Sequence, residues 1–203
     1  MSRACNRHSK LSLDETPTLF VEFHGSEAGT REQVERFGEI ARSNGGLRFD
    51  WAANLEDRNR LWKARHDVFW AVRGLRPGAE AITTDVAVPI SRLAECVVET
   101  RADVDRLGLL APLVGHVGDG NFHLQPLIDR SIPDEMAKAR ELLERLAERA
   151  IRMDGTVTGE HGIGQGKRKY LDAEHGAAVG VMRTIKAALD PLGIFNPGKI
   201  FPD

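Results

Sequence analysis

The fold is decided by residues 115–123, which read GHVGDGNFH. An Asp-Gly pair between short apolar runs is the strongest short-range signal for a β-hairpin. If Asp119 and Gly120 form a two-residue loop, His116 lies directly opposite His123 on one face of the hairpin. Directly opposed residues have Cβ atoms about 4.5–5.5 Å apart. The pattern therefore predicts two imidazoles close enough to bind one metal ion.

A third candidate ligand, Glu160, lies in the sequence TGEHG at 158–162. Glycines on both sides of an acid and a histidine suit a backbone that approaches another group closely and orients two side chains. Two histidines and one carboxylate with open positions are typical of a catalytic divalent site, not of a closed structural one. The spacing alone leaves a second interpretation open, in which each histidine is an ordinary hydrogen-bonded residue near a turn.

Three further residues are candidates for contact with a substrate. Gln125 lies two positions after His123 and therefore on the same strand face, where a structurally paired amide is the alternative. His161 follows Glu160, and because adjacent side chains diverge, a metal-bound Glu160 leaves His161 available as a general base. A loop histidine bonded to backbone is the alternative. Arg65 stands among aromatic residues, and its guanidinium either binds a carboxylate or covers its own helix face.

Hydrophobic periodicity outlines the remaining elements. Strands are expected at 18–24, 47–52 and 81–88, with the hairpin arms at 109–117 and 121–128. Helices are expected between 30 and 44, 54 and 74, 91 and 108, 131 and 155, and 176 and 189. This alternation, together with an antiparallel hairpin, predicts an α+β fold with helices packed on one face of a mainly antiparallel sheet.

Composition narrows the class of protein. A chain of 203 residues suggests a single domain, and a net charge of −2 without a basic aromatic face makes nucleic acid an unexpected partner. No run approaches the roughly 18 apolar residues of a membrane span. Cys5 and Cys96 form no disulfide framework, which fits a reducing compartment. The glycines and basic residues of 162–169 lack the spacing of a nucleotide-binding loop, so we expect a tight turn whose basic groups meet a carboxylate, a phosphate or solvent.

Three stretches together resemble one family closely: GHVGDGNFH at 115–123, TGEHGIG at 158–164 and LDPLGIFNPGK at 189–199. They resemble the C-terminal half of FAD-linked 2-hydroxy-acid dehydrogenases. PTLFVEFHG at 17–25 and TTDVAVP at 83–89 make the chain most similar to the cytochrome-type D-lactate dehydrogenases. The resemblance implies a ferredoxin-like, mainly antiparallel sheet with helices, which caps a separate FAD domain.

The resemblance also implies roles for individual residues. It implies that His116, His123 and Glu160 bind a divalent metal ion, and a site of two histidines and one carboxylate accepts zinc, manganese or iron. It also implies that His161 faces substrate and flavin, that Arg65 contacts the substrate carboxylate and that Asn196 lies near the flavin. Gln125 is the expected further substrate contact, at a position where relatives often carry Asn.

These observations predict the substrate- and metal-binding domain of an FAD-dependent D-2-hydroxy-acid dehydrogenase, which oxidises D-lactate to pyruvate with hydride transfer to FAD. The glycine-rich FAD domain of the family is absent from residues 1–203, so we expect no activity without a separate FAD domain or subunit. Residues 176–203 are expected to contact that domain.

Several alternatives stay open at this point. A His-His-Glu site also serves metal-dependent hydrolases, and a non-catalytic fragment that only binds metal and hydroxy acids is another alternative. A homodimer is an open question. The expected location is cytoplasmic, or mitochondrial in a eukaryote.

Overall fold

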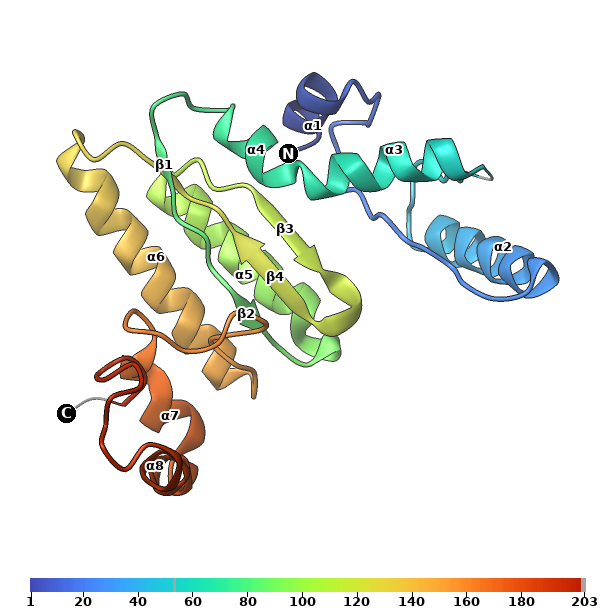
Figure 1. The fold of residues 1–203 in the computed structure, drawn as a ribbon. Helices are drawn as coiled ribbons and strands as arrows, with labels where there is room; N and C mark the ends of the chain where they lie inside the picture. Colours follow the sequence, from blue (N-terminus) through green and yellow to red (C-terminus); the bar gives the residue numbers. More distant parts are fainter. Residues whose placement is uncertain (53, 202–203) are drawn as a thin grey trace. The chain divides into compact units, whose positions relative to one another are not determined.

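The computed structural model describes residues 1–52 and 54–201. The chain divides into two compact units, Met1–Leu75 and Arg76–Asp203, and each is described by itself. Figure 1 traces both along the chain. None of the helices in the described ranges combines the length and apolar character that a membrane crossing requires.

The described part of the first unit is helical. Its elements are α1 (Ser2–Ser9), α2 (Glu27–Ser43), α3 (Leu55–His66) and α4 (Val68–Arg73). α2 begins three residues before the expected start, because the Ser26 hydroxyl caps it by accepting the backbone N–H of Gly29. The single helix expected between 54 and 74 is interrupted at Asp67, which ends α3 and precedes α4.

The strands expected at 18–24 and 47–52 are not formed. A strand needs a partner for its backbone N–H and C=O groups, and neither segment has a ladder partner among the described residues. Their aromatic side chains pack on α2 instead. Phe37 of α2 lies with its ring centroid 5.7 Å from that of Phe23 and 5.5 Å from that of Phe49. The strand pairing expected from the apolar pattern is therefore wrong, and Leu19, Val21, Leu47 and Trp51 of these segments are exposed.

The second unit combines two small antiparallel sheets with helices. In one sheet β2 (Val86–Ala87), β4 (Asn121–Leu124) and β3 (Leu113–His116) lie in the order β2-β4-β3, and in the other β1 (Glu80–Ala81) pairs with β5 (Leu127–Ile128). The expected strand at 81–88 thus forms as two short pieces. The helices are α5 (Ile90–Leu107), α6 (Pro133–Arg152), α7 (Leu171–His175) and α8 (Ala178–Leu189).

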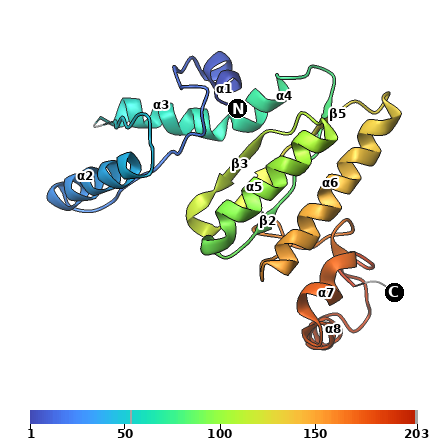
Figure 2. The same ribbon diagram turned by 180° about the vertical axis from the view of Figure 1, so that it is seen from behind.

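Helices α5 and α6 lie side by side on one face of the sheets, as the two opposite views show (Figures 1 and 2). Phe122 and Leu124 of β4 point into this layer, and both are about 1% exposed. They join a core built from α5, α6 and the strands, which includes Leu93, Cys96, Val104, Leu142, Leu146 and Met153. The α+β class with helices on one face of an antiparallel sheet is confirmed. Because side chains alternate along a strand, the neighbours of Phe122 and Leu124 face away from the helices.

The hairpin loop is longer than the sequence predicted. The strands are joined by a 3-10 helix, Val117–Asp119, and by Gly120 in a left-handed conformation at φ 71°. His116 therefore pairs with Asn121, and the expected pairing of His116 with His123 is wrong. The register differs by two residues, which keeps both histidines on one face because strand side chains alternate with period two. Their ring centroids lie 5.8 Å apart.

A buried ion-pair network joins α5 to α6. Arg149 of α6 bonds the carboxylate of Asp103, donates from Nε to Glu99 at 2.8 Å and donates from Nη1 to the hydroxyl of Thr100 at 3.0 Å. Arg145 adds a second bond to Asp103 at 2.8 Å. Burial acts to raise the pKa of Asp103, but the bonds from Arg149 and Arg145 outweigh it and lower that pKa.

We expect Asp103→Asn to destabilise the chain by about 3 kcal/mol, because it removes the buried one of the two carboxylates that pair with the Arg149 guanidinium. Asp105→Asn, two residues along the same helix, is the matched control. Its ion pair with Arg101 is exposed, so the loss is within about 0.5 kcal/mol. Urea unfolding followed by circular dichroism measures both values, and equal losses in the two variants would show that the buried pair of Asp103 and Arg149 contributes no more than an exposed one.

The same pair predicts a pH dependence. The pKa of Asp103 is lower in the folded chain than the roughly 3.9 of an unfolded Asp. Its stabilisation is therefore complete above about pH 4 and is lost as the pH falls through the folded-state pKa. The stability difference between the parent chain and Asp103→Asn narrows in that acidic range and stays constant between about pH 5 and 8.

Candidate metal centre

Three predicted ligands converge on the sheet face opposite the helices. The Nε2 atom of His123 lies 2.9 Å from Oε1 of Glu160, and Nε2 of His116 lies 3.7 Å from the same oxygen. One ligand atom from each of the three residues falls within 4.8 Å of the other two. Ligand atoms around a tetrahedral zinc ion, with bonds of 2.0–2.1 Å, are about 3.3 Å apart. Small side-chain adjustments therefore suffice to hold a cation.

His123 is oriented by a backbone carbonyl. Its Nδ1 atom lies 3.0 Å from the carbonyl oxygen of Thr84, and because a carbonyl only accepts, Nδ1 carries the proton. In a neutral imidazole this leaves a lone pair on Nε2, which faces the carboxylate of Glu160. Two acceptors at 2.9 Å require a proton or a cation between them or beside them. A carbonyl bonded to the far nitrogen is also how metal-binding histidines are usually fixed.

The segment that carries Glu160 returns to the sheet after α6. Thr156 exchanges two backbone hydrogen bonds with Ala87 of β2, at 2.8 and 3.1 Å, and so continues the sheet at its β2 edge. Gly159 follows, and a Cβ atom there would lie 2.0 Å from Nδ2 of Asn121. Only glycine therefore lets the chain cross this close to β4 and deliver Glu160 above His123.

Asp85 holds this segment from the sheet side. Its Oδ2 atom accepts the backbone N–H groups of Glu160 and His161, both at 3.0 Å, and the hydroxyl of Thr158 at 3.3 Å. Its Oδ1 atom accepts Nδ2 of Asn121 at 2.8 Å. Burial acts to raise the pKa of Asp85, but these donors outweigh it and lower that pKa. The side chain is therefore a buried, ionised acceptor.

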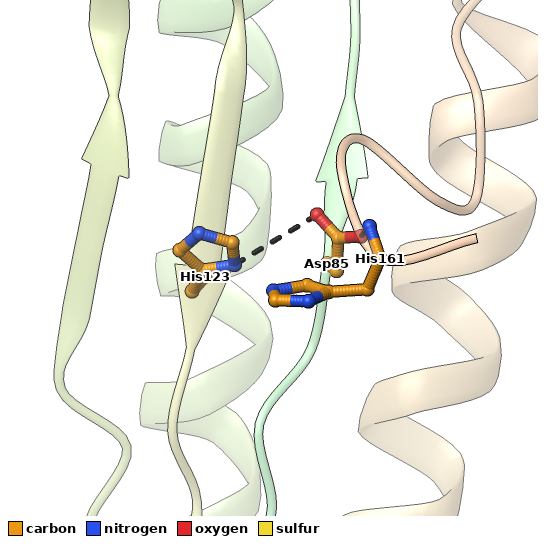
Figure 3. A group of neighbouring side chains, drawn as sticks. All are labelled: Asp85, His123 and His161. Carbon is orange, nitrogen blue, oxygen red and sulfur yellow. Dashed lines mark hydrogen bonds and ion pairs between the residues drawn. The ribbon is translucent and has the colours of Figure 1, made fainter. Parts of the chain in front are cut away.

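His161 lies beside the three predicted ligands. Its Nε2 atom is 3.5 Å from Oε1 of Glu160, its ring centroid is 5.7 Å from that of His123, and its side chain is 63% exposed. Asp85, His123 and His161 form a second group with the spacing of metal ligands (Figure 3). The lone pairs of Asp85 already accept four donors, so this carboxylate fits a supporting role better than a ligand role.

Lys167 completes the support of the site. Its Nζ atom donates to the backbone carbonyl of Asp85 at 2.8 Å and lies 4.0 Å from Oδ2 of the same residue. Burial lowers the pKa of Lys167, although the charge of Asp85 acts in the opposite direction. The next two basic residues meet other groups: Arg168 donates to the carbonyl of Gly198, and Lys169 pairs with Glu144.

Three further residues were predicted to contact substrate or flavin: Gln125, Asn196 and Arg65. Gln125 follows His123 on the same face and is 5% exposed, and its Oε1 atom has no hydrogen-bond partner among the described residues. Asn196 adopts a left-handed φ of 47° in the turn after α8, and its carbonyl accepts the N–H of Lys199. Arg65 lies in the last turn of α3, in the first unit. Their proposed contacts with substrate and flavin stay predictions.

Sequence reasoning missed the residues that position the ligands, above all Asp85, Asn121 and Lys167. A usable signal was present for Asp85, which is a charged residue inside the apolar run 81–88. Buried charges are almost always paired, so such a residue predicts partners of its own. For Asn121 and Lys167 the local pattern gives no comparable signal.

Residues 1–200 match the family of FAD linked oxidases, C-terminal domain, and the chain belongs to this family. The resemblance drawn from the sequence motifs is thereby confirmed. A solved structure with a similar fold is the 4-ethylphenol oxidase from Gulosibacter chungangensis in its isoeugenol complex, with a TM-score of 0.54 and 21% identity over 85% of this chain and 38% of that one. At this identity the likeness concerns the fold alone.

The sequence is also similar to named dehydrogenases and oxidases. It is 53% identical to the "Probable D-lactate dehydrogenase, mitochondrial" of Danio rerio over 201 residues. This alignment covers 98% of the chain and 40% of that protein. It is 43% identical to the mitochondrial D-lactate dehydrogenase (cytochrome) of Arabidopsis thaliana, over 98% of the chain and 35% of that protein. It is 31% identical to the glycolate oxidase subunit GlcD of Bacillus subtilis, over 90% of the chain and 39% of that protein. The chain thus spans less than half the length of the curated relatives it matches.

We expect Gly159→Ala to displace the segment that carries Glu160, because the added Cβ meets Nδ2 of Asn121. Overpacking of this kind costs about 1–3 kcal/mol. Gly164→Ala is the control, since a Cβ there has no described atom within 4 Å. Amide hydrogen exchange of residues 157–163 is expected to accelerate only in Gly159→Ala. Unchanged exchange in that variant contradicts the close approach.

Proposed function

We propose that this chain is the substrate- and metal-binding part of an FAD-dependent D-2-hydroxy-acid dehydrogenase that oxidises D-lactate to pyruvate. The observation that carries the proposal is the convergence of His116, His123 and Glu160 in a member of the FAD-linked oxidase family. The names of the relatives support D-lactate as substrate. Another named relative is a glycolate oxidase subunit, which supports a small 2-hydroxy acid as the substrate class.

The donor set fits a divalent cation. Two imidazole nitrogens and one carboxylate oxygen suit zinc, manganese or iron, and they leave coordination positions open. A cation bound there supplies Lewis acidity that polarises a substrate oxygen. His116, His123 and Glu160 are the proposed ligands, and His123 contributes a lone pair already oriented by Thr84.

The remaining residues have proposed roles in binding and proton transfer. Oxidation of D-lactate removes the hydroxyl proton and the α-hydrogen with its electron pair, and the C–O single bond becomes the carbonyl of pyruvate. The exposed imidazole of His161, beside Glu160, is the proposed acceptor of the hydroxyl proton. Arg65 is the proposed partner of the substrate carboxylate, and Gln125 a further substrate contact. FAD supplies the acceptor for the hydride.

The proposal includes partners and a location. The substrate is a small 2-hydroxy acid, and the protein partner is an FAD-binding domain or subunit, with Asn196 and the segment 176–203 as the expected contact. Nucleic acid is not among the proposed partners, and a homodimer stays an open prediction. A mitochondrial location is supported by the names of several relatives if the source is a eukaryote; otherwise we propose the cytoplasm.

A metal-dependent hydrolase uses a similar set of ligands, and a non-catalytic binding module is a third alternative. Family membership favours the oxidoreductase, since the matched family consists of FAD-linked oxidases. Turnover of esters or amides that depends on added metal and needs no flavin would support the hydrolase instead.

We expect His123→Ala and Glu160→Gln each to weaken zinc binding by at least about 100-fold, because each removes one of three ligands. His24→Gln is the control, since that side chain is 76% exposed and is not one of the three proposed ligands. Isothermal calorimetry with zinc alone measures the dissociation constants. Parent-like affinity in His123→Ala rules out the proposed centre.

We expect the 203-residue chain with FAD and a redox dye to show no D-lactate oxidation, and to gain it when supplied with the flavin-binding domain of a related D-lactate dehydrogenase. In that complex His161→Gln lowers kcat by about 10²–10⁴-fold, as expected for loss of a general base. L-lactate is the control substrate. Robust dye reduction by the chain alone contradicts the proposed need for a separate flavin-binding domain. Binding of hydroxy acids to the complex without turnover supports the non-catalytic alternative.

A further inference from the structure

We propose that Asp85 is the positioning residue of the metal centre, which it orders through the backbone of Glu160 and His161 without binding the metal itself. The inference rests on the proposed function for its metal readout, but its structural claim concerns this chain's own residues. None of the functional roles expected from the sequence motifs falls on Asp85.

The first step is the direction of the hydrogen bonds. The Oδ2 atom of Asp85 accepts two successive backbone N–H groups, those of Glu160 and His161, each at 3.0 Å. Two bonds to adjacent peptide units fix the orientation of the chain between them as well as its position. The Glu160 side chain leaves from this fixed unit and reaches His123 at 2.9 Å. The carboxylate of Asp85 thus sets where the carboxylate of Glu160 lies.

The second step is that Asp85 is itself fixed. Its other oxygen accepts Nδ2 of Asn121, and the same Nδ2 donates to the carbonyl of Val86 at 2.9 Å. Asn121 cannot be turned over, because its Oδ1 atom would then face two acceptors. Lys167 holds the backbone of Asp85 from a third direction. Asp85 is 3% exposed, so water does not replace these donors.

The site requires a carboxylate at position 85 because both of its oxygens accept hydrogen bonds. An asparagine at position 85 has nearly the same shape as the aspartate, but one of its two carboxylate oxygens is replaced by an NH2 group. That NH2 group would face either the backbone N–H groups of Glu160 and His161 or the fixed NH2 group of Asn121. In both orientations a donor meets a donor, and buried donors left unpaired cost free energy. The segment 157–163 would move away from the sheet, and Glu160 with it. Loss of such supporting groups typically weakens metal affinity by about 10–100-fold.

The first arm of the test needs no metal. We expect Asp85→Asn to accelerate amide hydrogen exchange at Glu160 and His161 by at least about tenfold in the chain. Asp172→Asn is the control, since it removes the same charge from an exposed position on α7. Protection of the two amides in Asp85→Asn equal to that of the parent chain overturns the inference.

The second arm measures zinc binding by calorimetry in a double-mutant cycle. We expect Asp85→Asn to weaken zinc affinity about 10–100-fold, and to change it less than about twofold when Glu160→Gln is already present, because Asp85 acts through Glu160. A merely structural role gives losses that add in the double variant, and this outcome also overturns the inference.

The two arms separate the inference from the proposed function. If the parent chain binds no zinc, the metal centre fails, while exchange at Glu160 and His161 still decides whether Asp85 orders the segment. If Asp85→Asn does not fold, Gly159→Ala replaces it, because the added Cβ, 2.0 Å from Nδ2 of Asn121 and 2.9 Å from Oδ1 of Asp85, displaces the same segment. Tight zinc binding by a Gly159→Ala chain whose segment exchanges freely counts against the inference.

Discussion

The site depends on one buried carboxylate that joins three segments of the chain. Asp85 precedes β2, accepts a side-chain donor from β4, and accepts three donors from the segment after α6. A hydrogen bond to a charged group contributes about 1.5–3 kcal/mol, whereas an unpaired buried carboxylate costs several. The arrangement that satisfies all four donors is therefore strongly favoured over any in which one segment has moved.

The sheet face that carries the proposed metal ligands was predictable, because strand periodicity is not affected by a register error of two residues. The two-residue loop expected at Asp119 and Gly120 was wrong, and the true register differs by two residues. An even shift leaves His116 and His123 on the same side of the sheet, so the conclusion survived the error. A shift of one residue would have turned His123 toward the helices and removed the site. Long amphipathic helices such as α6 were predicted for the same reason, since a clear period tolerates errors at its ends.

The supporting contacts could not be predicted because they join residues that are distant in the sequence. Asp85 and Asn121 are 36 positions apart, and Asp85 and His161 are 76 apart. The local sequence pattern indicates which face of a helix or strand is buried, but it does not identify the distant residues that contact that face. The segments 18–24 and 47–52 illustrate the same limit. Phe23 and Phe49 pack on Phe37, but strand pairing also needs a partner strand, which the local sequence pattern does not identify.

The two carboxylates of the proposed metal site differ in the partners that balance their charge. Two carboxylates lie on this face of the sheet. The charge of Asp85 is balanced by its four donors and by Lys167, whose Nζ atom is 4.0 Å from Oδ2. The ion-pair partners of Glu160 in the described ranges are all histidines: His116, His123 and His161. The carboxylate of Glu160 therefore has no lysine or arginine partner among the described residues, and it lies 2.9 Å from Nε2 of His123, whose ring is oriented by the carbonyl of Thr84.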